Sequence, residues 1–106
     1  MAKFLYIGSY TAQGAKGVLK DGGTARRRAA EQVIASVGGS VESFYFGFGK
    51  DDFFVTFDAP SAAAAAAVAL TVGGSGAVSG RTVPIITAEE MDDAAKMSPT
   101  YTPPGG

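Results

Sequence analysis

The sequence predicts an α+β domain built on a four-stranded antiparallel sheet. β-branched and aromatic residues gather in four short segments, alanine-rich segments with helical spacing lie between them, and clusters of glycine or aspartate separate them. The chain has 106 residues, the size of one domain, and 18% of them are charged. Soluble domains usually have about 25% charged residues, so we expect another molecule to cover part of the surface.

The first half of the chain predicts two strands and one strong helix. Residues 3–10 predict the first strand, and residues 12–20 predict a weak helical turn that contains two glycines. A stronger helix is expected from Thr24 to about Val37, because apolar residues recur every three or four positions until a glycine pair ends the pattern. Residues 40–48 predict the second strand.

The second half repeats this pattern, although not the sequence. Residues 49–52 have the length and chemistry of a hairpin turn, which leads into a third strand over 53–58. An alanine-rich helix over 62–70 and a fourth strand over 77–86 follow, and Pro84 indicates an edge position or a bulge. The resulting order, β-α-β-β-α-β, is that of a ferredoxin-like fold.

The residues after the fourth strand predict an appendage. Thr87 and Glu90 have the spacing of a capping box, so we expect a short helix that ends near Met97. Residues 98–106 are rich in proline, threonine and glycine and predict an extended tail, either disordered or laid across a neighbour. We therefore interpret residues 1–97 as one domain that includes the C-terminal helix, and residues 98–106 as a tail.

Apolar residues on both sides of the predicted strands indicate self-association. In the second strand, strict alternation places Val41 on the face opposite Phe44 and Phe46. Two helices cover one face only, and leaving the other in water would forgo on the order of 10 kcal/mol. The simplest cover is the sheet of a second copy, packed face to face in a homodimer or a larger even oligomer. The alternative is that the C-terminal helix folds over the open face of its own chain.

The residue types that are missing restrict the chemistry. The sequence has no His, Cys, Trp or Asn, which excludes Ser-His-Asp and Cys-His nucleophile systems, His-ligated haem, and His or Cys zinc sites. We expect no cofactor and no metal. The formal net charge of −1 gives no field that attracts nucleic acid or a membrane. The start of the chain resembles a strand rather than a secretion signal, so we expect a cytoplasmic protein.

Three polar clusters have both a functional and a structural interpretation. Residues 17–24 have the spacing of a phosphate-binding loop, but Gly23 occupies the position of the essential lysine, which favours a plain glycine loop. Arg26-Arg27-Arg28 can bind an anion at a helix N-terminus or form a solvated face with salt bridges. Asp51-Asp52 can bind a hard cation or act as acid and base, although such pairs in hairpins usually only form the turn.

Tyrosines and basic residues near the strands supply a candidate ligand site. A tyrosine hydroxyl and an arginine can together bind a carboxylate or an enolate, while the structural interpretation is that the tyrosines belong to core and interface. The residues we assign to a pocket between sheet and helices are Tyr6, Ser9, Tyr10, Lys16, Tyr45 and Arg81. The sequence thus favours a small-ligand-binding or accessory protein. The alternative is a cofactor-free enzyme acting on a small aromatic or enolisable metabolite.

The stretch GKDDFFVTFDAP at residues 49–60, followed by an alanine-rich helix, resembles the GYD domain family, as do residues 76–91. The resemblance covers about residues 3–95. It implies a bacterial-type protein of the dimeric α/β-barrel group, with a ferredoxin-like fold and sheets packed face to face. The Gly-Tyr-Asp motif that names the family would fall at Gly49, Asp51 and Asp52, with Lys50 inserted, and Asp51 stands where tyrosine is expected.

The wider barrel group includes cofactor-free monooxygenases, haem-handling enzymes and small lactone isomerases. Members that use His, Trp or Asn have no counterpart here, because the chain lacks all three residue types. The resemblance therefore carries an expectation about fold and assembly, and none about a particular reaction.

Overall fold

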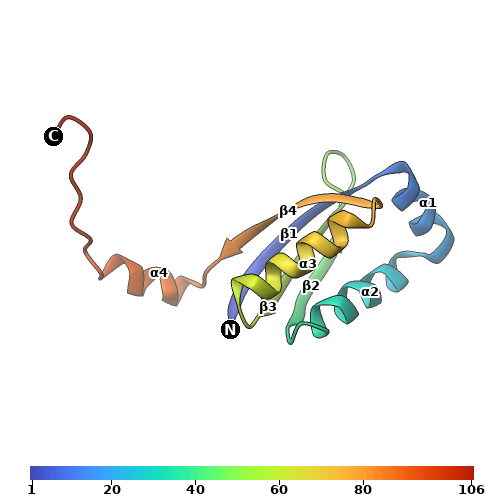
Figure 1. Cartoon of the computed structure of the whole chain (residues 1–106), viewed down its shortest axis with the longest axis horizontal. Coiled ribbons are helices and arrows are strands. Elements are labelled where there is room, and N and C mark those ends of the chain that lie inside the picture. The colour runs from blue at the N-terminus through green and yellow to red at the C-terminus, as the bar shows by residue number, and fades with distance from the viewer.

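The computed structural model describes residues 1–106 and shows a sheet with two helices against one of its faces (Figure 1). Its strands are β1 (Ala2–Tyr10), β2 (Ser40–Phe46), β3 (Phe53–Ala59) and β4 (Val78–Ile85). Its helices are α1 (Ala12–Asp21), α2 (Gly23–Ala35), α3 (Ala62–Gly74) and α4 (Ala88–Ala95). All strand pairs are antiparallel and the order across the sheet is β2-β3-β1-β4, which confirms the predicted α+β, ferredoxin-like architecture.

The segment between β1 and β2 is more helical than its glycines suggest. Thr11 caps α1 by accepting a hydrogen bond from the backbone N–H of Gly14, and the helix continues to Asp21. Gly22 then takes a φ of 84°, a conformation that favours glycine, and the chain turns into α2. Residues 17–21 are therefore helical and form no phosphate-binding loop.

The core lies between the sheet and the inner sides of α2 and α3. Phe57 in β3 is the most completely buried large side chain, with 1% of its surface exposed, and its ring stacks on that of Phe4 with centroids 5.6 Å apart. Ile34 of α2 and Val68 of α3 pack onto the same cluster. Since these two helices lie on one side of the sheet, the core occupies one sheet face only (Figure 1).

A β-bulge in β2 changes which of its residues face this core. Val41 is paired with Phe57 and Ser43 with Thr56, so Glu42 is an extra residue in the ladder. Val41 and Phe44 consequently both pack against the core. The expectation that Val41 lies opposite Phe44 is wrong, because strict alternation fails where a residue is inserted.

The second face of the sheet is open and carries apolar side chains in its middle. The pairing of strands aligns two rows there: Tyr45, Phe54, Ile7 and Arg81, and next to it Ser43, Thr56, Leu5 and Val83. We call this surface the open face. Tyr45 is 69% exposed, while Leu5, Ile7 and Phe54 are partly exposed. The predicted presence of apolar residues on both sides of the sheet is thus confirmed.

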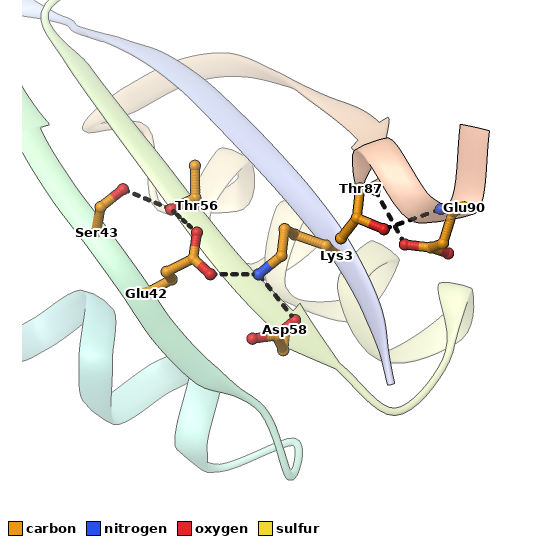
Figure 2. A network of polar contacts seen from close by, with 7 residues as sticks. All are labelled: Lys3, Glu42, Ser43, Thr56, Asp58, Thr87 and Glu90. Atoms are coloured by element: carbon orange, nitrogen blue, oxygen red, sulfur yellow. Dashed lines mark hydrogen bonds and ion pairs between the residues drawn. The ribbon is translucent and has the colours of Figure 1, made fainter. Parts of the chain in front are cut away.

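One end of the open face is polar (Figure 2). Lys3 of β1 donates hydrogen bonds to Glu42 and to Asp58, the latter at 3.2 Å from Nζ to Oδ1. The hydroxyls of Ser43 and Thr56 also share a hydrogen bond. The inserted Glu42 therefore has a role, since the bulge brings its carboxylate to the lysine of β1.

Residues 87–106, which we call the C-terminal arm, extend away from the sheet (Figure 1). The capping box of Thr87 and Glu90 is formed as predicted (Figure 2), yet α4 contains no buried residue. The radius of gyration is 16.7 Å, against about 13 Å for a compact chain of this length. The arm thus leaves the open face of its own chain uncovered. None of the helices combines the length and the apolar character that crossing a membrane requires.

Candidate functional site

A cavity of about 250 Å³ lies between the core face of the sheet and the helices α2 and α3. The residues that line it are predominantly apolar, and strands β2 and β3 and helices α2 and α3 supply most of the larger ones: Phe44, Phe53, Val55, Phe57, Val33, Ile34, Val68 and Val72. A dry cavity of roughly 150 Å³ is sufficient to bind benzene. The space is therefore large enough for one ring with its substituents.

Aromatic rings form the sheet-side wall of the cavity. The ring of Phe53 lies at its centre, with centroids 5.1 Å from Tyr10, 5.8 Å from Tyr6 and 5.8 Å from Phe44. The rings of Phe44 and Phe53 are nearly parallel, with an interplanar angle of 3°. Stacked and tilted rings of this kind suit a flat ligand, because aromatic groups prefer offset-stacked or edge-to-face contacts.

Two glycines on neighbouring strands make room for these rings. Gly8 of β1 is paired with Gly80 of β4. A Cβ atom on Gly8 would lie 2.2 Å from the ring of Phe53, and one on Gly80 would lie 2.5 Å from the hydroxyl oxygen of Tyr6. The absence of side chains at these two positions therefore allows both aromatic side chains to lie flat over the sheet.

We expect Gly8→Ala to lower the free energy of unfolding by about 1–3 kcal/mol, because the added methyl group displaces the Phe53 ring in a packed region. Gly17→Ala is the matched control, since a Cβ there meets nothing within 4 Å and alanine favours the helix. Urea denaturation of both variants measures the difference. Equal stability of the two variants would show that Gly8 is not needed for the ring to fit.

Thr71 and Ser75 of α3 and its C-cap add hydroxyls to the lining of the cavity, and three larger side chains bring polar groups to it from the sheet and α2. Tyr6 and Tyr10 of β1 and Arg26 of α2 all line it. Burial raises the pKa of the Tyr6 hydroxyl above its usual 10.0. Burial also raises the pKa of the Tyr10 hydroxyl, and the Arg26 guanidinium beside it offsets only part of this shift. At neutral pH the cavity thus presents two protonated hydroxyls and a permanent cation, which together can hold an anionic group.

The raised pKa values predict an alkaline loss of stability. In the unfolded chain these tyrosines ionise at the usual pKa of 10.0, so unfolding becomes coupled to proton release above that pH. Stability is therefore unaffected at neutral pH and falls as the pH rises above 10. Absorbance at 295 nm should show a late-ionising component that shrinks in Tyr6→Phe and in Tyr10→Phe. Persistence of the full late component in both variants would contradict the assignment.

The model of the GYD domain matches residues 4–95, from β1 through α4. The chain belongs to the GYD domain family. The resemblance predicted from residues 49–60 and 76–91 is thereby confirmed. No curated protein and no solved structure gives a significant match.

In this GYD domain the predicted site residues do not all come together. Tyr6 and Tyr10 line the cavity. Tyr45 and Arg81 lie on the open face in the row that contains Phe54, so the sheet itself separates them from Tyr6. The expected grouping of Tyr6, Tyr45 and Arg81 around one cavity is therefore not formed.

The two other predicted residues lie outside the cavity as well. The hydroxyl of Ser9 donates a hydrogen bond of 3.1 Å to the backbone carbonyl of Lys50, in the turn between β2 and β3. Lys16 is exposed on α1. Asp52, in the same turn, accepts a hydrogen bond of 2.7 Å from the backbone N–H of Tyr10. This contact gives Asp52 a structural role in holding the turn against the end of β1.

Arg26 is a site residue that the sequence indicated only as part of the basic run Arg26-Arg27-Arg28. Its spacing to Ala29, Ala30 and Val33 places it on the apolar side of α2, facing the cavity. Arg27, by contrast, forms an exposed salt bridge with Glu31, with 3.9 Å between Nε and Oε1. Helical spacing relative to the apolar residues was thus the signal that distinguishes Arg26 from its two neighbours.

Proposed function

We propose that this GYD-domain protein binds a small, flat organic anion in the cavity between the sheet and helices α2 and α3. The observation that carries the proposal is that one guanidinium and two tyrosines, those of Arg26, Tyr6 and Tyr10, line a cavity whose other walls are almost entirely apolar. Ligand sites typically combine an apolar enclosure with a few polar groups that fix orientation. We propose that binding takes place in the cytoplasm, the compartment that the sequence predicts.

The chemistry of the walls specifies the ligand class. The planar guanidinium of Arg26 matches a carboxylate or an enolate in geometry and charge. The rings of Phe44 and Phe53 offer parallel surfaces for a planar body. A volume of about 250 Å³ limits the ligand to about one ring. An aromatic carboxylate or phenolate satisfies all three conditions.

The test is a calorimetric titration with benzoate and with its neutral analogue benzamide. We expect benzoate to bind the native protein more tightly than benzamide, and Arg26→Gln to weaken benzoate binding by about tenfold or more, because a charge-assisted contact contributes about 1.5–3 kcal/mol. Benzamide binding should change little. Arg28→Gln is the matched control, since Arg28 is exposed on the same helix and does not line the cavity.

Two results would contradict the proposal. One is the absence of binding by the native protein to benzoate, salicylate and 4-hydroxybenzoate alike. The other is an equal loss of affinity in Arg26→Gln and Arg28→Gln, which would mean that general charge rather than the cavity attracts the anion.

The proximity of Tyr10 to Arg26 supports a second candidate, a cofactor-free enzyme acting on an enolisable metabolite. The metabolite would bind as the enolate that it forms by ionising in water, and the Arg26 guanidinium would stabilise the enolate oxygen. The Tyr10 hydroxyl, which is protonated at neutral pH, would donate a proton to the carbon and regain one from solvent. Proton exchange of a 1,3-dicarbonyl compound in deuterated water measures this activity. It should disappear in Tyr10→Phe, while benzoate binding should weaken by less than it does in Arg26→Gln, because a neutral hydrogen bond contributes less than a charge-assisted one. Equal exchange in native protein and Tyr10→Phe would contradict an enzymatic role.

We also infer that the protein works as a homodimer in which the open faces pack against each other. Leu5, Ile7 and Phe54 supply apolar area on this face, and the C-terminal arm of the same chain leaves them uncovered. Two sheets of equal size can cover such faces mutually through a two-fold axis. The dimer would leave the cavity accessible, because the cavity lies on the other side of the sheet.

A further inference from the structure

We propose that the C-terminal arm of one copy docks on helix α1 of a second copy, with α4 lying against the exposed face of α1. This inference deepens the proposed self-association, and it depends on that proposal only in requiring a second copy. It assigns a function to residues 87–106, whose helix α4 has no residue buried against its own chain.

The arm carries a charge that the rest of the chain complements. It has four carboxylates, from Glu89, Glu90, Asp92 and Asp93, against the single cation of Lys96, and hence a formal charge of −3. Because the whole chain has a formal charge of −1, residues 1–86 have a charge of +2. The two parts of the molecule therefore attract each other when they belong to different copies.

Helix α1 offers both the charge and the apolar contact that α4 needs. Lys16, Leu19 and Lys20 lie on one helical face, at spacings of three and four residues. Leu19 is 87% exposed, and no salt bridge involves either lysine. On α4, Met91 is also exposed and is flanked by the carboxylates. The two helices can therefore pack with Met91 against Leu19 and with the carboxylates of α4 beside the lysines of α1.

The arm cannot make this contact within its own chain. α1 begins beside the start of β4, where the backbone N–H of Thr11 donates to the carbonyl of Ala77. α4 follows the opposite end of β4, whose eight residues span roughly 26 Å at about 3.3 Å each. Figure 1 shows α1 and α4 at the two far ends of the molecule. Only the α1 of another copy is therefore within reach of α4.

The length of α4 also indicates that it needs a partner. It has eight residues, and isolated helices shorter than about 12–15 residues are marginal in water even when they are rich in alanine. The capping box fixes where the helix begins. Packing of Met91 on another surface would supply the remaining stabilisation.

The test uses engineered cysteines, which are unambiguous because the chain contains none. A full-length Met91→Cys protein labelled with ¹⁵N is mixed with unlabelled Leu19→Cys protein and oxidised gently, and mass spectrometry identifies the mixed disulfide. We expect this disulfide in clear excess over that from a control pair, Met91→Cys with Ala63→Cys. Ala63 is exposed on α3, which carries no charged residue.

Charge variants then test the specificity of the contact. Reversing Lys16 and Lys20 together to glutamate in the Leu19→Cys protein should abolish the excess, and adding Asp92→Lys and Asp93→Lys to the Met91→Cys protein should restore it. Raising the salt concentration to about 1 M should also reduce it, because exposed charges are then screened beyond about 3 Å. The proposal is overturned if the yield of the mixed disulfide is no higher than that of the control pair, or if the charge reversals leave this yield unchanged.

Sedimentation velocity on the same samples separates this proposal from that of the sheet dimer. A dimer that forms without the mixed disulfide overturns the docking of the arm and leaves the packing of open faces intact. A monomer without the disulfide overturns both. The open-face substitution Phe54→Asp is then added to both proteins, so that they no longer form the sheet dimer in dilute solution. If the mixed disulfide still forms, the result supports the arm contact as an independent interaction.

Discussion

Replacing Phe57 by alanine should lower the free energy of unfolding by about 3–5 kcal/mol, the usual cost of removing a fully buried phenylalanine. Phe57 is 1% exposed, stacks on Phe4 and borders the cavity. A domain of this size has a net stability of about 5–15 kcal/mol, so the variant should retain little of it. Urea denaturation followed by circular dichroism is the measurement.

The matched control for Phe57→Ala is Phe54→Ala in the same strand. Phe54 lies on the open face and is only partly buried in one chain, so at concentrations where the protein is monomeric its loss should cost less. A difference of less than about 1 kcal/mol between the two variants would contradict the assignment of one sheet face to the core.

Replacing Phe54 by aspartate should convert the proposed homodimer to a monomer. Phe54 is paired with Ile7 and Tyr45 in the middle row of the open face. A two-fold axis would place two such residues in one interface, each contributing about 1.5–3 kcal/mol, so the dissociation constant should rise by about two orders of magnitude or more. Ala63→Asp, on the exposed surface of α3, should leave it unchanged.

Sedimentation velocity over a range of concentrations measures this change in association. If the native protein is already a monomer at high micromolar concentration, or if Phe54→Asp and Ala63→Asp behave alike, the open face is not the interface. The polar cluster of Lys3, Glu42 and Asp58 satisfies its own hydrogen bonds, so its presence at one end of the face does not oppose packing.

The sequence was sufficient to predict the elements and their order, because β-branched strands, alanine-rich helices and glycine breaks all agree in this chain. It was insufficient for side-chain orientation in β2. There the inserted Glu42 places Val41 and Phe44 on the same face, against strict alternation. No sequence pattern marks the position of such a bulge.

The candidate site was predictable in part. Tyr6 and Tyr10 each lie an even number of positions along the chain from Phe4, so alternation along β1 places all three on the core face. Tyr45 and Arg81 were grouped with Tyr6 on chemistry alone, and their registry with Ile7 places them on the other face. Arg26 was also predictable, because its spacing to Ala29, Ala30 and Val33 places it on the apolar side of α2, but the cavity that this side borders depends on the packing of the whole chain.

The central claim is that the cavity beneath α2 and α3 binds a small, flat organic anion, and methyl-detected NMR tests it most directly. On titration with 4-hydroxybenzoate, the account predicts that the shifted methyl signals are those of cavity valines: Val33, Val55, Val68, Val72 and Val78. Val83 on the open face and Val18 on α1 do not line the cavity and should not shift. Shifts confined to Val83 and its neighbours, or no shifts at saturating ligand, would contradict the claim.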